Sequence, residues 1–456
     1  MLRRAMVVGA LAALLMAPAA ALSQEKEEAT LAEVLKRLEA LERENVKLRG
    51  EVDRLGKRKP TIQSDELRAL VKELAEKETV TTGLTAGYDK HFFLSDADRK
   101  FLVQIEGQVQ GRYVYNYRDG ASKGAGFDEE EAGFLMRRAK VGFKGHVFDP
   151  SLEYKIKGGF ERSGGGFILE DAYLKYKCDD QHYVQFGQHK APFLHEELVS
   201  SGKQLTVERS AVNEMFTVDF AQGVTVGGKY DLGSGLGWSV SLHDGREQDN
   251  TDFDEDATEF AVAGRVEVLV AGSWKQFKDF VAWEKDAVGL LVGAAADYGQ
   301  MDSGSGTTSS LRDYLAYTAD VSLEAHPFNA FAAFVGRHGE LDGAGGSIDQ
   351  TGVVAQGGVF ILPETVDVFA RGEYIDYDGV GEFGHKVDPL SVITLKDEVM
   401  IYTWGFNYYV EKHDVKFTLD LMWAPDGIRA GESGAGTLTS VEDDEFVARF
   451  QVQLLF

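Results

Sequence analysis

The stretch FLVQIEGQVQGRYVYNY, residues 101–117, decides the fold because its polarity alternates from one residue to the next. Every odd-numbered position holds an apolar residue, a tyrosine or a glycine, whereas the even-numbered positions include Gln104, Glu106 and Arg112. Side chains of a β-strand point alternately to opposite faces of the sheet. A strand this long, with one apolar and one polar face, is typical of a barrel that spans a membrane around a polar interior.

Short and long connections alternate through the rest of the chain. Short turns are expected at 148–151, 178–181, 231–235, 326–329, 362–365 and 411–414, and a seventh connection between about 270 and 287. Long loops are expected around 118–132, 163–167, 188–220, 246–256, 301–311, 341–348, 379–397 and 425–442. Eight long and seven short connections join sixteen strands. The sequence therefore predicts an all-β, 16-stranded antiparallel transmembrane β-barrel over residues 96–456.

The seventh connection is longer than the other short turns. Its sequence GSWKQFKDFVAWEKD, residues 272–286, predicts a periplasmic excursion, with a helix that sets four aromatic side chains against the foot of the barrel. These aromatic residues are Trp274, Phe277, Phe280 and Trp283.

The final strand, FVARFQVQLLF over residues 446–456, repeats the alternation and is expected to close the barrel against the first strand. Its apolar positions, together with the terminal aromatic residue, resemble the signal read by the bacterial outer-membrane assembly machinery. The predicted assembly signal comprises Phe450, Val452, Leu454 and Phe456.

The N-terminal region predicts export. Arg3 and Arg4 precede an apolar run over residues 5–17 and then small residues, which predicts a signal peptide over residues 1–23. The competing interpretation, a membrane-anchoring helix, needs a longer apolar run.

A heptad pattern follows the signal peptide and predicts an α-helical coiled coil in the periplasm over residues 24–58, with a linker over residues 59–95. The number of helices in it stays open, as does the alternative of a single charged helix on a surface. The heptad positions are Leu31, Val34, Leu38, Leu41, Asn45, Leu48, Val52 and Leu55.

Charge and motifs exclude several function classes. The formal net charge of −26 argues against a nucleic-acid partner. The chain has a single cysteine, Cys178, so it forms no intramolecular disulfide. It lacks an H-E-x-x-H motif, and no catalytic set of residues stands out. We therefore expect no enzyme activity, no metal site and no cofactor.

A sector of basic residues is expected on the inner wall of the second to fourth strands. In the second strand, alternation places Leu135 and Ala139 outward. The alternative, in which acidic neighbours such as Glu153, Glu161 and Asp171 pair with these bases only to hold the barrel in shape, stays open. The predicted basic wall comprises Arg138, Lys140, Lys144, Lys155, Lys157, Lys175 and Lys177.

The loop over residues 188–216 is expected to fold into the barrel and set its constriction, because loops of this length in compact domains are usually functional. Glu197 and Glu208 are expected to oppose the basic residues of the loop. The constriction candidates are Lys190, His195, Glu197, Ser200, Ser201, Lys203, Glu208 and Arg209.

Five segments resemble the phosphate-selective porin O and P family of Gram-negative bacteria: GFLMRRAKVGFKG (133–145), LEDAYLKYK (169–177), FGQHKAPF (186–193), EELVSSGK (196–203) and ERSAVNEMF (208–216). The resemblance implies a trimeric sixteen-stranded porin with the long loop folded inward. It also implies a pair of serines flanked by lysines in the loop. Ser200, Ser201 and Lys203 match this pattern, but Glu197 stands where a lysine would be expected.

These observations together predict an outer-membrane porin that lets small hydrophilic solutes diffuse through a water-filled channel, with a preference for anions and with phosphate or polyphosphate as candidate solutes. The alternative is a structural tether that joins the outer membrane to the cell wall through the coiled coil. The expected partners are outer-membrane lipid and lipopolysaccharide, small anions or other hydrophilic solutes, two further copies in a homotrimer, and peptidoglycan as a candidate for the coiled coil.

Overall fold

The computed structural model describes residues 83–118, 129–162, 164–231, 234–246, 250–252, 258–301, 311–341, 347–378, 398–428, 432–440 and 444–456, and positions 43, 46 and 47. The predicted signal peptide, and nearly all of the predicted coiled coil and linker up to residue 82, lie outside the described residues. The chain divides into the units Met1–Thr82 and Gly83–Phe456, and the second unit holds every strand of the described residues.

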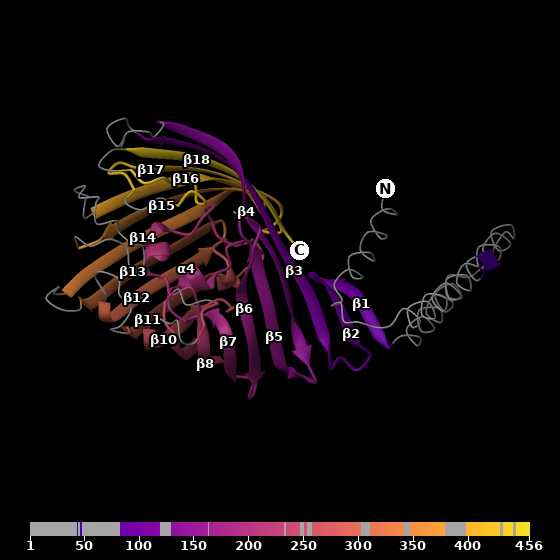
Figure 1. Cartoon of the computed structure of the whole chain (residues 1–456). Helices are drawn as coiled ribbons and strands as arrows, with labels where there is room; N and C mark the ends of the chain where they lie inside the picture. The colour runs from indigo at the N-terminus through magenta and orange to yellow at the C-terminus, as the bar shows by residue number, and fades with distance from the viewer. Residues whose placement is uncertain are drawn as a thin grey trace, which may run out of the picture. The chain divides into compact units, whose positions relative to one another are not determined.

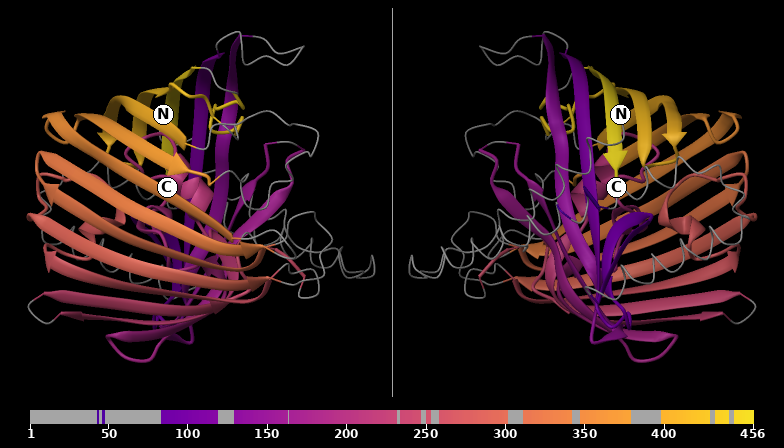
Figure 2. Two further views of the ribbon diagram at one scale, coloured as in Figure 1. Left: turned by 90° about the vertical axis from the view of Figure 1, so that its left-hand side faces the viewer. Right: turned by 90° about the vertical axis from the view of Figure 1, so that its right-hand side faces the viewer.

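Sixteen antiparallel strands of the described residues, β3 to β18, each pair with the next, and β18 pairs back with β3 (Figures 1 and 2). This confirms the predicted closed barrel and its strand number. The bounds are β3 Leu102–Arg118, β4 Glu130–Val147, β5 Asp149–Phe160, β6 Phe167–Lys177, β7 His182–Lys190, β8 Phe220–Asp231, β9 Gly235–His243, β10 Thr258–Ala271, β11 Gly289–Met301, β12 Leu311–Ala325, β13 Phe328–Leu341, β14 Ser347–Leu362, β15 Val366–Asp376, β16 Glu398–Glu411, β17 Val415–Ala424 and β18 Glu445–Leu455.

The two faces of the wall follow the alternation in the sequence. In β3, Val109 is 38% exposed and Tyr113 is equally exposed on the outer face, whereas Gln110 and Arg112 are buried on the inner face. An outer barrel face this apolar is stable in contact with lipid, whereas its exposure to water would be unfavourable. None of the helices among the described residues is long and apolar enough to cross a membrane.

The barrel closes where β18 meets β3. The Gly107 amide donates to the Phe456 carbonyl at 2.8 Å, and the Phe456 amide donates to the Gly107 carbonyl at 3.1 Å. The Phe456 ring lies where a side chain at position 107 would be, so a larger residue there would have to displace the ring. Phe450, Val452 and Leu454 are exposed on the lipid face. Their role in assembly stays a prediction.

A short hairpin precedes the barrel and was not predicted. Strands β1, Leu84–Asp89, and β2, His91–Asp96, pair with each other, and β2 pairs with residues 102–105 of β3. Strand β18 occupies the same edge of β3 only from Gln108 onward. The hairpin therefore continues the wall beyond the last residue of β18. The sequence interpretation missed it because each strand has only six residues, too few to show a membrane-spanning alternation.

The connection between β10 and β11 contains one short 3₁₀ turn, η2, Gln276–Lys278, in place of the predicted longer helix. Its aromatic residues pack inside the barrel rather than on its foot. Phe280 contacts Phe331 with ring centroids 4.9 Å apart, and Trp283 contacts Tyr409 at 5.1 Å. Phe331 and Tyr409 are buried side chains of β13 and β16. The apolar run 280–283 folds inward because those strands offer apolar partners there.

Candidate functional site

The connection between β7 and β8, residues 191–219, lies inside the barrel, as predicted for the constriction loop. It carries the short helices α4, His195–Leu198, and α5, Ala211–Phe216 (Figure 1). Inward-facing side chains of β16, β17 and β18 donate hydrogen bonds to the backbone carbonyls of this loop. Gln453 donates to the Gly202 carbonyl at 2.8 Å, Lys416 to that of Gln204 at 2.8 Å and Asn407 to that of Leu205 at 2.9 Å. These hydrogen bonds fix the loop across the lumen.

One side of the loop is apolar and packs against the wall opposite β4 to β7. Phe193, Leu205 and Met215 are each at most 1% exposed and belong to one apolar cluster with Val335 of β13 and Ile375 of β15. Helix α5 contacts β13, β14 and β15. The loop therefore fills that side of the lumen, and the remaining passage runs between the loop and strands β4 to β7.

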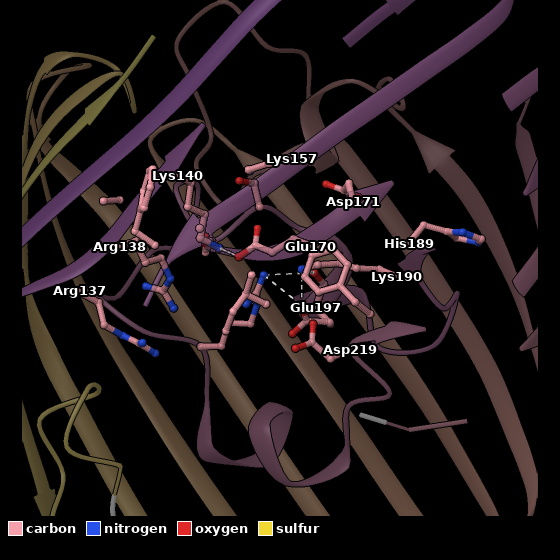
Figure 3. A pocket seen from close by; sticks show the side chains of 18 of the residues that line it. Arg137, Arg138, Lys140, Lys157, Glu170, Asp171, His189, Lys190, Glu197 and Asp219 are labelled. Carbon is pink, nitrogen blue, oxygen red and sulfur yellow. Dashed lines mark hydrogen bonds and ion pairs between the residues drawn. The ribbon is translucent and has the colours of Figure 1, made fainter. Parts of the chain in front are cut away.

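A cavity of about 1090 Å³ occupies this passage. Its walls come from strands β4 to β7, from the loop and from the start of β8 (Figure 3). Eight basic residues line it: Arg137, Arg138, Lys140, Lys155, Lys157, Arg162, Lys190 and Arg209. Six acidic residues line it: Glu161, Glu170, Asp171, Glu197, Glu214 and Asp219.

A β-bulge in β4 adds a basic residue that simple alternation missed. Gln110 pairs with Arg138 but Gly111 pairs with Met136, so Arg137 is an extra residue in the register. The bulge reverses the phase of the strand. Arg137 and Leu135 consequently line the cavity, and Met136 is exposed on the outer face, so the prediction that Leu135 points outward was wrong.

A second bulge lies in β6. Lys157 pairs with Asp171 but Gly158 pairs with Leu169, which leaves Glu170 as the extra residue. Glu170 forms an ion pair with Lys140 across the cavity wall (Figure 3). Both bulges thus place two consecutive charged residues on the lumen side.

Three arginines converge on Glu208 of the loop. Its Oε1 lies 2.6 Å from Arg112 Nη2 and 2.6 Å from Arg137 Nε, and its Oε2 lies 2.6 Å from Arg138 Nη2. Burial raises the pKa of the Glu208 carboxyl, but the three guanidinium groups outweigh it and hold this pKa well below its usual range. Glu208 alone therefore neutralises only one of these three positive charges, and a second carboxylate, that of Glu432, lies 3.2 Å from Arg137.

The family model for phosphate-selective porin O and P matches residues 107–453. The chain belongs to this family. It is an outer-membrane porin, and the barrel, the inward loop and the charged passage are the parts of its channel.

The chain is similar to several solved structures. An anion-selective porin from Comamonas acidovorans has 12% sequence identity and a TM-score of 0.54, over 78% of this chain and 99% of that chain. The outer membrane channel DcaP of Acinetobacter baumannii has 15% identity and a TM-score of 0.48, over 77% and 97% of the two chains. Salmonella typhi OmpF in complex with daunomycin has 12% identity and a TM-score of 0.49, over 81% and 100%. No curated protein sequence matches the chain.

The predicted basic wall of the porin is divided between two regions. Arg138, Lys140, Lys155 and Lys157 line the cavity, and of these four only Lys157 has no ion pair among the described residues. Lys155 pairs with Asp171 at 2.8 Å. The alternative of paired charges thus describes part of this wall.

The remaining three lysines of the predicted wall lie outside the cavity. Lys144 pairs with Glu106 at 3.0 Å, and Lys177 pairs with Glu153 at 2.6 Å. The Lys175 ammonium lies 3.8 Å from the centre of the Tyr183 ring. The structure therefore does not bring these three lysines to the cavity.

The loop candidates also separate into two groups. Lys190, Glu197, Ser200, Ser201 and Arg209 line the cavity. His195, Lys203 and Glu208 do not. The His195 ring is buried, with its centroid 5.8 Å from that of Phe280, so the structure does not place it in the passage.

Glu197 is neutralised by its neighbours. It forms an ion pair with Lys190, lies 3.3 Å from Arg209 and accepts from Asn213 Nδ2 at 2.8 Å (Figure 3). Burial raises the pKa of the Glu197 carboxyl, but Arg209 and Lys190 outweigh burial and lower it to about 2. The acid that departs from the family pattern is thus balanced by two bases.

The ion selectivity of the channel is expected to depend on pH through Asp219, which lies beside Glu197. Burial, followed by the nearby Glu197 charge, raises the pKa of the Asp219 carboxyl to about 7, although Lys190 and Arg209 lower it. The carboxyl is neutral below this pH, so the passage loses one negative charge as the pH falls from 8 to 6. One charge at about 8 Å in water changes the energy of a monovalent ion by ~0.5 kcal/mol, in opposite directions for chloride and potassium, which is about fivefold in their permeability ratio.

We therefore expect the chloride-to-potassium permeability ratio, measured as a reversal potential in a KCl gradient, to rise about fivefold between pH 8 and pH 6. The variant Asp219→Asn should show the higher ratio at both pH values. An equal pH response in this variant would assign the titration to another group.

Proposed function

We propose that this porin is a homotrimer whose channels let small hydrophilic solutes pass and prefer anions. The observation that carries the preference is the excess of basic over acidic side chains around the cavity, with Lys157 free of an ion pair among the described residues. A water-filled passage with positive walls concentrates anions. An unpaired Glu197 would repel anions along the loop, but Lys190 and Arg209 neutralise its charge.

Phosphate and polyphosphate are the candidate solutes. Ser200 and Ser201 line the same cavity as Lys190 and Arg209, so hydroxyl donors and positive charges face one space. Phosphate oxygens accept hydrogen bonds from both kinds of group. The trimer is inferred from membership of the porin family. The heptad pattern of residues 24–58 implies an oligomer but leaves the number of chains open, since a single helix of that kind leaves its apolar seam uncovered. The tether to the cell wall remains a hypothesis that rests on the same residues.

The test is the reversal potential of single channels in planar bilayers under a KCl gradient, followed by addition of phosphate. A reversal potential on the chloride side, with block of the chloride current by phosphate, supports the proposal. A reversal potential on the potassium side contradicts the anion preference. Intact trimers that carry no current would favour the tether.

A substitution of Lys157 is the most direct test, because this lysine lines the cavity and has no ion pair among the described residues. Lys157→Glu exchanges a positive for a negative charge in the passage, a change of about 1 kcal/mol at ~8 Å in water. Because chloride and potassium are affected in opposite directions, we expect the chloride-to-potassium permeability ratio to fall about thirtyfold. Lys177→Glu, which alters a lysine outside the cavity, should lower the ratio less. Equal effects of the two variants would show that overall charge, rather than the cavity, sets selectivity.

A further inference from the structure

A second connection, between β17 and β18, also reaches the lumen side of the wall. The structure describes its residues 425–428, 432–440 and 444. The backbone carbonyls of residues 434–436 accept hydrogen bonds from inward-facing side chains of β3 and β18, the two strands that close the barrel. The donors are Arg112 at 3.1 Å, Arg449 at 3.0 Å and Asn116 at 3.0 Å. These contacts hold this part of the connection against the inner wall.

Glu432 begins this inward segment, in a tight turn whose backbone is fixed by its own hydrogen bonds. The Glu432 carbonyl accepts from the amides of Ala435, Gly436 and Thr437 at 2.9, 3.1 and 3.2 Å. The Glu432 amide donates to Thr437 Oγ1 at 2.9 Å. The turn is therefore a fixed support for the Glu432 side chain, and only the carboxylate is left for other groups to hold.

The Glu432 carboxylate bridges two arginines of the cavity. Its Oε1 lies 3.2 Å from Arg137 Nη2 and 3.6 Å from Arg162 Nη2. Among the described residues, this is the one ion pair that Arg162 forms. A side chain at Gly434 would overlap the Arg162 guanidinium, so a larger residue there would have to displace this arginine. Because Ser433 lines the cavity with both arginines, the contact lies at the wall of the passage.

The contact of Glu432 differs from that of Glu208 in its exposure to water. The Glu432 side chain is 46% exposed, whereas that of Glu208 is 6% exposed among three guanidinium groups. Ion pairs between partly exposed groups contribute little to stability. An anionic solute can therefore displace the Glu432 carboxylate at small cost by rotation of one side chain, with the backbone of the turn kept in place.

We propose that Glu432 is a tethered competitor for anionic solutes, whose carboxylate occupies the position between Arg137 and Arg162 that a phosphate or carboxylate group of a solute takes. Carboxylate and phosphate oxygens make the same charge-assisted hydrogen bonds to guanidinium groups. A channel needs binding that is weak enough for the solute to leave, and an internal competitor weakens it. The inference rests on the proposed anion path and adds the residue that limits how tightly an anion is held there.

The experiment measures the concentration of inorganic phosphate that halves the chloride current of single channels formed by the full chain. Glu432→Gln keeps the shape of the side chain and removes its charge. Without the competitor, the half-blocking concentration should fall about threefold to fivefold, the factor that a partly exposed ion pair contributes. Each blocked interval should also last longer.

Two further variants separate competition from a general effect of charge. Glu161 lines the same cavity and has no ion pair among the described residues, so Glu161→Gln removes an equal charge without freeing an arginine. It should lower the half-blocking concentration by a smaller factor. In an Arg162→Gln background, Glu432→Gln should also have a smaller effect, because one of its two partners is already absent. Equal factors for Glu432→Gln and Glu161→Gln, or an undiminished effect without Arg162, would overturn the proposal.

The competitor and the proposed anion preference fail separately. A wild-type channel that prefers potassium contradicts the anion preference, but a lower half-blocking concentration in Glu432→Gln would still support the competitor. A chloride-preferring channel in which phosphate blocks the wild type and Glu432→Gln equally would overturn only the competitor. Absence of phosphate block in both proteins would overturn it as well.

Discussion

Replacing Glu208 with glutamine is expected to increase the anion preference of the channel about fivefold or more. Glutamine keeps the shape of the side chain but removes the charge that Arg112, Arg137 and Arg138 share. A unit charge at 4 Å is worth about 1 kcal/mol in bulk water and about 4 kcal/mol near a protein surface. Two of these arginines line the cavity, so a mobile anion can take the place of the lost carboxylate.

The measurement is the chloride-to-potassium permeability ratio at pH 5 and pH 8. Because the pKa of Glu208 is held well below its usual range, its carboxylate is charged at both pH values and the increase should be the same at both. Glu208→Asp keeps the charge and should keep the wild-type ratio. A folded Glu208→Gln channel with unchanged selectivity would show that this carboxylate only holds the loop in place.

If Glu208→Gln fails to assemble, the double variant Glu208→Gln with Arg112→Gln tests the same idea with the net charge of the cluster preserved. Arg112 is the fully buried member of the cluster, with no exposed side-chain area. The double variant should assemble and show wild-type selectivity. A selectivity change in the double variant would mean that geometry rather than net charge matters.

The sequence was sufficient for the barrel because the pattern that predicts it is local. Alternation marks each strand, and the lengths of the connections determine which ends lie together, so counting loops gives sixteen strands. The same reasoning assigned the constriction loop, since a segment between β7 and β8 that long is seldom without a role. Both predictions can be made without information on side-chain contacts.

The candidate site was predicted only in part because its geometry depends on register. Arg137 and Glu170 are bulge residues, which have no pairing partner of their own on the neighbouring strand. The sequence of one strand does not determine how it pairs with its neighbour. A signal was present nevertheless. Phe134 and Met136 are apolar at even positions, whereas Ala139, Val141 and Phe143 are apolar at odd positions, and this change of phase marks the bulge.

The positions of His195 and Glu208 could not be predicted for a different reason. Both lie on the loop, where no strand periodicity fixes the direction of a side chain. His195 is buried against Phe280 of a segment eighty-five residues away, and Glu208 is buried among arginines of two strands. Only the folded chain brings these partners together, so local pattern identifies the loop but not the face that each residue presents.

Replacing Asp420 with alanine is expected to destabilise the barrel and release the constriction loop. Asp420 Oδ1 lies 2.7 Å from Arg449 Nε, and its Oδ2 lies 3.0 Å from Arg449 Nη2 and accepts from the Val207 amide at 3.2 Å. Both partners of the ion pair are essentially fully buried. Removing one partner of such a pair leaves a buried unpaired charge, which costs about 3–5 kcal/mol.

The measurement combines the temperature at which the barrel unfolds in detergent with the noise of single-channel currents. The Asp420→Ala porin should unfold at a clearly lower temperature and show larger current fluctuations, because Val207 and the adjacent loop residues lose their anchor on β17. Asp420→Asn still offers an oxygen to the Val207 amide and should reduce stability without raising the noise as much. An Asp420→Ala barrel with wild-type unfolding temperature would show that lumen water screens the Arg449 charge, and the lumen would then behave as solvent even at this buried pair.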